Sequence, residues 1–73
     1  MDNQPGLIEV IVNGEPRSVE AGIDLEQLLL RLELPPARVA VERNRRVVPR
    51  GRFSGEPVRD GDRLEIVTLV GGG

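Results

Sequence analysis

Residues 7–20 read L-I-E-V-I-V-N-G-E-P-R-S-V-E and predict a β-hairpin. Asn13-Gly14 between two strand-like runs is the strongest short hairpin signal, because both residue types tolerate the positive φ angles of a type I′ turn. We expect the first strand over Leu7–Val12 and the second over Pro16–Glu20, with the proline near its start, where a missing N–H matters least. Alternation places one set of aliphatic side chains of the first strand on a single face. These are Ile8, Val10 and Val12.

A short amphipathic helix should follow the hairpin. Asp24 is a preferred N-cap residue, and Gln27 completes a capping-box pattern three residues later. Pro35-Pro36 predicts that the helix ends at or just before Leu34, after about ten residues. Leu30 is interpreted as a flank of the core. One apolar stripe at helical spacing should pack against the sheet. It consists of Leu25, Leu28, Leu29 and Leu32.

The second half of the chain predicts three more strands. Residues 38–42 alternate, residues 46–48 form a short strand, and Asn44-Arg45 is the turn between them. Phe53 should be a satellite core residue under the irregular stretch 51–57. The elements together predict an α+β fold, with one main helix across one face of a mixed sheet of four to five strands.

The last strand, residues 63–70, is the most strongly β-branched segment and leads directly into Gly71-Gly72-Gly73. Leu64 and Ile66 should face the core, which makes the alternating positions of the same strand exposed. The exposed aliphatic residues are Val67 and Leu69. We expect a single domain over residues 7–70.

The composition excludes several kinds of active site. The chain contains no Cys, His, Lys, Trp or Tyr, and all ten of its basic residues are Arg. Without Cys there is neither a disulfide nor a thiolate nucleophile, and without Cys or His a zinc or copper site is not expected. Without Lys there is no Schiff base and no P-loop lysine. We therefore expect a binding or carrier domain with no catalytic residue and no bound metal or cofactor, rather than an enzyme.

The charges are unevenly distributed along the chain. Residues 1–37 carry seven acidic residues against two Arg, whereas residues 38–73 carry eight Arg against five acidic residues. Five of these Arg lie within residues 43–52 and could contact phosphates. Because Phe53 is the only aromatic residue that could stack on a base, we expect no nucleic acid. The cluster is interpreted as a solvated loop, with docking of a protein partner as the alternative.

No segment predicts membrane insertion or secretion. The longest apolar run is Leu28–Leu30, far short of the ~20 residues that cross a bilayer. Residues 1–6 are polar and lack the basic and apolar regions of a secretory signal, so they are interpreted as a flexible leader. The cytoplasm is the expected location.

Gly71-Gly72-Gly73 does not fit a purely structural account. Glycine loses the most backbone entropy on ordering, so three in a row contribute nothing to stability. They are useful if the main chain must enter a narrow channel, and the reactive group at the tip is then the terminal α-carboxylate. We expect residues 71–73 to be a flexible tail that presents this carboxyl group.

Five stretches of the chain match the pattern of a known family. They are I-V-N-G-E at 11–15, D-L-E-Q-L-L at 24–29, V-A-V-E-R-N at 39–44, V-V-P-R at 47–50 and G-D-R-L-E-I-V-T-L-V-G-G-G at 61–73. On these stretches the chain resembles the ThiS family of sulfur carriers in bacterial thiamine biosynthesis, which have the ubiquitin-like β-grasp fold. The last stretch is the most specific, because related molybdopterin-synthase small subunits usually carry prolines before their Gly-Gly. Arg45 departs from the pattern, standing where the family often has Gly, and Phe53 replaces a frequent Trp.

The resemblance implies that Gly73 carries the sulfur. An E1-like adenylyltransferase of the ThiF type would use ATP and Mg²⁺ to adenylate its carboxyl group. A persulfide donor, supplied by a cysteine desulfurase, would then leave a thiocarboxylate, whose sulfur passes to a ThiG-type thiazole synthase. Gly71 and Gly72 would let the tail enter the active sites of these partners. The residues that would dock the partners are Val67, Leu69 and Val70.

Three alternatives remain open from the sequence. The same fold could serve another sulfur acceptor, such as molybdopterin, a tRNA base or an amino-acid precursor. A ubiquitin-like modifier would instead join Gly73 to target proteins through an isopeptide bond. A nucleic-acid-binding module would use the Arg cluster.

Overall fold

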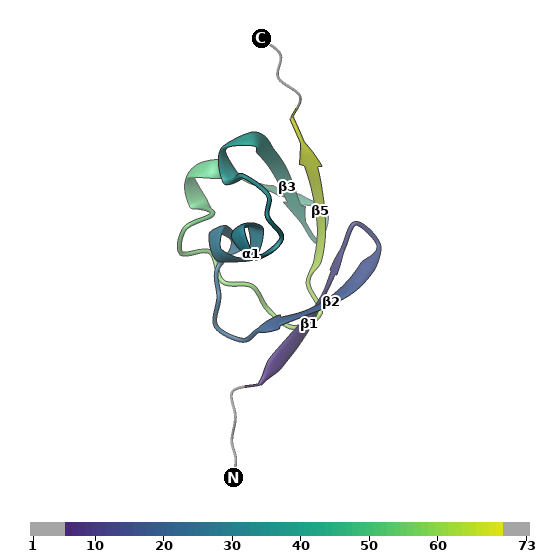
Figure 1. Cartoon of the computed structure of the whole chain (residues 1–73). Helices are drawn as coiled ribbons and strands as arrows, with labels where there is room; N and C mark the ends of the chain where they lie inside the picture. Colours follow the sequence, from purple (N-terminus) through teal and green to yellow (C-terminus); the bar gives the residue numbers. More distant parts are fainter. Residues whose placement is uncertain (1–5, 70–73) are drawn as a thin grey trace.

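A five-stranded mixed sheet carries one α-helix on one face in the computed structural model, which describes residues 6–69 (Figure 1). Two single-turn 3₁₀ helices, η1 and η2, lie in the connections before β3 and after β4. The elements are β1 Leu7–Val12, β2 Glu15–Glu20, α1 Leu25–Arg31, η1 Pro36–Arg38, β3 Val39–Arg43, β4 Arg46–Val48, η2 Arg50–Arg52 and β5 Arg63–Thr68.

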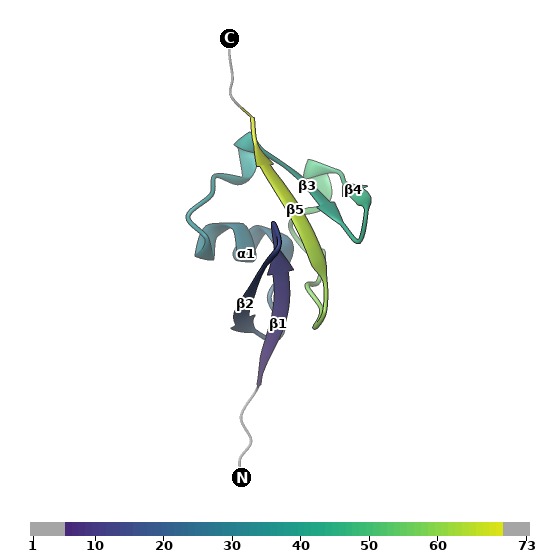
Figure 2. The ribbon, with the colours of Figure 1, turned by 90° about the vertical axis from the view of Figure 1, so that its right-hand side faces the viewer.

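The strand order is β2-β1-β5-β3-β4, so the first and last strands are neighbours in the middle of the sheet (Figure 2). β1 and β5 run parallel, with Ile11 beside Arg63 and Val12 beside Leu64. The other neighbouring pairs are antiparallel. This arrangement confirms the predicted α+β class and the β-grasp fold.

Both hairpins turn through residues with positive φ angles. Asn13 and Gly14 have φ angles of 50° and 86°, as the Asn-Gly signal predicts for the first hairpin. In the second hairpin Asn44 and Arg45 have φ angles of 51° and 72°. Arg45 therefore occupies a left-handed position that glycine would adopt without steric cost.

The capping box at the start of α1 is confirmed. The backbone N–H of Gln27 donates to the Asp24 carboxylate at 2.8 Å, and the Gln27 side-chain oxygen accepts from the Asp24 N–H at 3.0 Å. The next amides are satisfied from outside the helix: the Leu25 N–H donates to the Glu56 carbonyl and the Glu26 N–H to the Phe53 carbonyl. The start of α1 is thus held against residues 53–56.

The predicted end of α1 is wrong: the helix ends at Arg31, whereas the sequence predicted an end at or just before Leu34. Glu33 adopts a left-handed φ of 61°, and its N–H donates to the Leu30 carbonyl at 3.0 Å. The Leu34 N–H donates to the Leu29 carbonyl at 2.9 Å. These two bonds form a Schellman motif, which reverses the chain before Pro35-Pro36 is reached.

The core lies between α1 and the inner face of the sheet. Leu28 and Leu29 are fully buried, while Leu32 is half-buried and Leu30 is 57% exposed, so Leu30 does not flank the core. Phe53 is buried, as predicted, but it belongs to the main cluster and not to a satellite of it. The cluster comprises Val10, Val12, Val19, Ile23, Leu25, Leu28, Leu29, Val39, Val41, Val48, Phe53, Val58, Leu64 and Ile66.

Among residues 6–69 no helix is long and apolar enough to cross a membrane.

Candidate functional site

The candidate site is the end of β5, where the chain leaves the sheet. The Leu69 N–H donates to the Arg38 carbonyl at 2.7 Å, one residue after the strand itself ends at Thr68. β5 ends on the opposite side of the molecule from the start of β1 (Figure 1). The remaining residues of the predicted site, namely Val70, Gly71, Gly72 and Gly73, lie outside the described residues.

Exposed aliphatic side chains lie on the open face of the sheet, on β5 up to this exit and on β4. Val67 is 59% exposed and Leu69 43%, which confirms the predicted exposure, while their role in docking stays a prediction. Ala40 lies opposite Val67 on β3, and Val47 on β4 is 69% exposed. Sequence reasoning did not single out Val47. The alternation of β4 was the available signal, because a buried Val48 requires an exposed Val47.

Two asparagines hold β5 from both sides. Asn13 bonds the Ile66 backbone twice: its Nδ2 donates to the carbonyl at 3.0 Å and its Oδ1 accepts from the N–H at 2.8 Å. The Asn44 side-chain oxygen accepts from the Arg63 N–H at 3.0 Å, and the Asn44 backbone N–H donates to the Arg63 carbonyl at 2.8 Å. Each asparagine is also the first turn residue of its hairpin. The strand that leads to the tail is therefore fixed to both hairpin turns.

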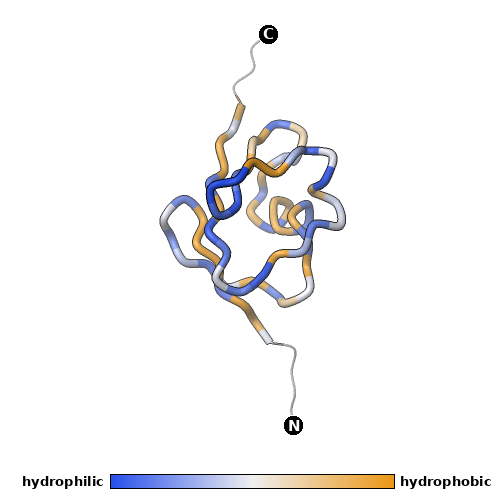
Figure 3. The backbone as a smooth tube through the Cα atoms, turned by 180° about the vertical axis from the view of Figure 1, so that it is seen from behind, coloured by the Kyte–Doolittle hydropathy of each residue, from blue (hydrophilic) through white to orange (hydrophobic). Residues whose placement is uncertain are grey.

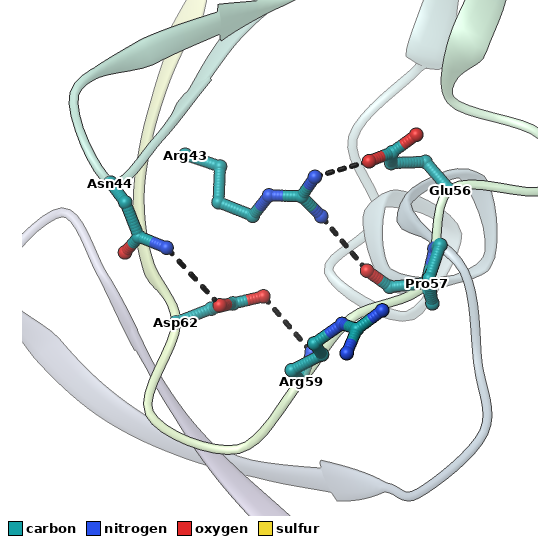
Figure 4. A network of polar contacts seen from close by, with 6 residues as sticks. All are labelled: Arg43, Asn44, Glu56, Pro57, Arg59 and Asp62. Atoms are coloured by element: carbon teal, nitrogen blue, oxygen red, sulfur yellow. Dashed lines mark hydrogen bonds and ion pairs between the residues drawn. The ribbon is translucent and has the colours of Figure 1, made fainter.

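A polar network supports the loop before β5 (Figure 4). The Asp62 side chain is buried and accepts from the Arg59 N–H at 2.9 Å. The Arg43 guanidinium forms an ion pair with Glu56 and donates to the Pro57 carbonyl at 2.8 Å. Arg43 and Glu56 are both about four-fifths buried, so this ion pair is part of the structure rather than a surface contact.

The predicted Arg cluster is therefore divided between two roles. Arg43 belongs to the network, whereas Arg45, Arg46, Arg50 and Arg52 are exposed. The turn between β3 and β4 is hydrophilic, and the end of β5 is hydrophobic (Figure 3). Arg45 and Arg46 belong to this turn and the start of β4, whereas Arg50 of η2 lines a hollow together with Glu26 of α1.

The electrostatics of the described residues offer no catalytic constellation. Hydrogen bonds from the backbone N–H groups of Gln27 and Gly55 lower the pKa of Asp24 below its ordinary value, but this carboxylate caps a helix. No group of three or more acidic, His or Cys side chains in residues 6–69 could hold a metal ion.

Comparison with known proteins places the chain in a family. The model of the ThiS family matches residues 10–73. The chain belongs to the ThiS family. A crystal structure of the thiamine biosynthesis protein ThiS from Geobacter metallireducens superimposes with a TM-score of 0.75 at 35% sequence identity, over 90% of this chain and all of that one.

Two curated relatives extend the comparison. The sulfur carrier protein ThiS of Escherichia coli (strain K12) is 27% identical over 90% of this chain and its own full length. The thiazole synthase of Magnetococcus marinus is 44% identical over 66 residues. This ThiS-family chain spans only 20% of the length of that thiazole synthase, although 90% of the chain is matched.

Proposed function

We propose that this protein is a sulfur carrier for thiamine biosynthesis and that the carboxyl group of Gly73 carries the sulfur. The match of the ThiS family model through residue 73 is the observation that carries the proposal. In addition, β5 ends on an exposed apolar face, which leaves room for a partner beside the tail. Catalysis would be performed by the partners, and this chain would present the carboxyl group.

The proposed loading step begins with activation of a poor electrophile. A Gly73 carboxylate oxygen attacks the α-phosphorus of ATP in a ThiF-type activating enzyme that holds Mg²⁺, and pyrophosphate leaves. The terminal sulfur of a persulfide, supplied by a cysteine desulfurase, then attacks the acyl carbon and AMP leaves. A second thiol reduces the resulting acyl disulfide, which releases the thiocarboxylate and a disulfide of the two thiols.

The glycines have a steric role in this proposal. The four residues after Leu69 span at most about 14 Å when extended, so the reacting carbon has to reach its partner's active site within that length. Gly71 and Gly72 would pass through a channel too narrow for side chains, because glycine lets the backbone approach a binding surface closely. Val67, Leu69 and Val70 would lie at the mouth of that channel and contact the partner.

A ThiG-type thiazole synthase is the proposed sulfur acceptor. The Magnetococcus marinus protein named thiazole synthase contains a segment similar to nearly the whole of this chain, and that segment is a small part of its length. Two activities that act in sequence are often efficient in one polypeptide, because linkage raises the effective concentration of one for the other. The similarity therefore supports thiazole synthase as a partner of the free carrier.

Delivery to purified thiazole synthase tests the proposed acceptor. Loaded protein should return to its unmodified mass while the thiazole product forms, and carrier that was never loaded should give no product. If loaded protein gives its sulfur to a molybdopterin precursor or a tRNA but not to thiazole synthase, the thiazole assignment is wrong. Covalent adducts with other proteins through Gly73 would instead indicate a ubiquitin-like modifier.

A further inference from the structure

Asn13 and Asn44 occupy equivalent places in the two hairpins, but only Asn13 is followed by glycine. Each is the first residue of a two-residue turn, and their φ angles are 50° and 51°. Each side chain also bonds the backbone of β5. The next residue is Gly14 in the first hairpin and Arg45 in the second. The chain therefore contains two matched asparagines that differ in the residue that follows them.

An asparagine before a glycine can react with its own backbone. The nitrogen of the following peptide bond attacks the side-chain carbon Cγ, the Cγ–Nδ2 bond breaks, and Nδ2 leaves as ammonia with the proton of the attacking N–H. The product is a five-membered succinimide ring. Water then opens the ring at one of its two carbonyl carbons and leaves aspartate or isoaspartate. A following glycine favours the attack, because it has no Cβ atom to hinder the approach of its nitrogen.

In the folded protein the nucleophile of this reaction is free and the leaving group is held. Among residues 6–69 the backbone N–H of Gly14 has no backbone acceptor, and Asn13 is exposed to water. The Asn13 Nδ2, however, donates to the Ile66 carbonyl at 3.0 Å, and its Oδ1 accepts from the Ile66 N–H at 2.8 Å. Ring closure breaks the Nδ2 bond, because this nitrogen departs as ammonia. The reaction therefore requires that β5 releases the Asn13 side chain.

We propose that Asn13 is a deamidation site, that its bonds to Ile66 keep it unreactive, and that the modification permanently loosens β5. A carboxylate has no N–H donor, so aspartate leaves the Ile66 carbonyl unpaired and puts a negative charge beside it. Isoaspartate also adds a carbon atom to the backbone of a two-residue turn whose geometry is fixed by its length. Because the reaction uses only water and residues 13 and 14, it is independent of the proposed sulfur transfer.

The bonds to Ile66 should slow the reaction in the folded protein. Two hydrogen bonds favour the closed state, so we expect Asn13 to deamidate about tenfold more slowly in the native protein than in the same chain unfolded in urea at the same pH and temperature. Asn44 is the internal control for the chemistry. In the unfolded chain it should react at least about tenfold more slowly than Asn13, because Arg45 has a side chain where Gly14 has none.

Two matched substitutions distinguish local release of β5 from unfolding of the whole domain. Ile66 and Ile23 are both core residues that are 6% exposed, but only Ile66 bonds Asn13. Replacement of a core isoleucine by valine is mild enough to leave the fold intact. Ile66→Val should raise the fraction of molecules in which β5 releases Asn13, and so speed native deamidation by about two- to fivefold. Ile23→Val should leave the native rate unchanged.

The experiment ages the full chain in buffer made with heavy-oxygen water and follows it by peptide mapping. Each event replaces the side-chain nitrogen by one oxygen from water, so the heavy label counts new events and fragmentation assigns them to Asn13 or Asn44. The modified protein, separated by ion exchange, should have a lower Tm than the unmodified protein.

Four outcomes would overturn the proposal. The first is an Asn13 that stays unmodified even in the urea-unfolded chain, and the second is an Asn13 that reacts as fast in the native protein as in urea. The third is equal acceleration by Ile66→Val and Ile23→Val, because Asn13 would then react only after the whole domain unfolds. The fourth is an unchanged Tm of the modified protein, because β5 would then not be loosened.

Discussion

Asn13 bonds both the N–H and the carbonyl of Ile66, 53 residues later in the chain, at 2.8 Å and 3.0 Å. The amide side chain thereby replaces a missing strand neighbour for β5 at the point where β1 turns into its hairpin. This contact joins the predicted turn to the strand that carries the tail. The conformation of one turn residue and the position of the candidate site thus depend on each other.

Loss of this contact should destabilise the protein. Asn13→Gly keeps the positive φ angle of 50° accessible and removes only the two side-chain hydrogen bonds. We expect a loss of about 1–2 kcal/mol in the free energy of unfolding, measured by urea denaturation. Asn13→Ala adds the cost of a left-handed alanine and should lose more. If Asn13→Gly unfolds at the same urea concentration as wild type, the contact does not stabilise β5.

The largely buried ion pair between Arg43 and Glu56 should contribute more to stability than an exposed arginine of the same cluster. Arg43→Gln leaves Glu56 without its partner and should cost about 1–3 kcal/mol of unfolding free energy. Arg45→Gln is the matched control, since Arg45 is exposed on the turn, and should change stability by less than about 0.5 kcal/mol. Equal losses from the two variants would contradict the division of the cluster into a structural and an exposed part.

Glu33 is a site where glycine should stabilise the protein. Its left-handed φ of 61° is unfavourable for a residue with a Cβ atom, whereas glycine adopts it freely. Glu33→Gly should raise the free energy of unfolding by about 0.5–1 kcal/mol. Glu26→Gly, the same substitution within α1, should lower it by about the same amount. Similar destabilisation by both variants in thermal unfolding would show that Glu33 does not terminate the helix as described.

The Asp24 carboxylate should make stability depend on acidic pH. Hydrogen bonds from the backbone N–H groups of Gln27 and Gly55 lower the pKa of Asp24 in the folded protein below its ordinary value of 3.8. The stabilisation is therefore complete above about pH 4 and is lost as the pH falls through the folded pKa. Asp24→Asn should be less stable than wild type at neutral pH, with a difference that shrinks under acid conditions. A difference in Tm that stays constant down to the lowest pH would contradict this.

The turns and the start of the helix could be predicted from sequence because their signals are local. Asn13-Gly14 sets its own φ angles, and Asp24 with Gln27 forms a capping box within four residues. The end of α1 could not be placed in this way, because Glu33 has no intrinsic preference for a left-handed conformation. Pro35-Pro36 excluded a longer helix but did not require a shorter one.

The candidate site was predictable in part for a similar reason. Alternation within β5 identified Val67 and Leu69 as exposed. The facing of Ala40 and Val67 depends on the register between two strands more than twenty residues apart, and no pattern within either strand specifies it. The Asn13 and Asn44 contacts to β5 also require the strand order. The sequence showed that each asparagine is a turn residue, but not what its side chain binds.

The mass of the intact protein shows whether Gly73 carries the sulfur. The chain is incubated with ATP, Mg²⁺, the activating enzyme and a persulfide donor, and fragmentation then locates any change. We expect one oxygen of the Gly73 carboxyl group to be replaced by sulfur, and no change of mass when Gly72 and Gly73 are deleted, although that variant keeps the wild-type Tm. An unchanged mass of the full chain, or sulfur at any residue other than Gly73, would show that Gly73 is not the carrier of the sulfur.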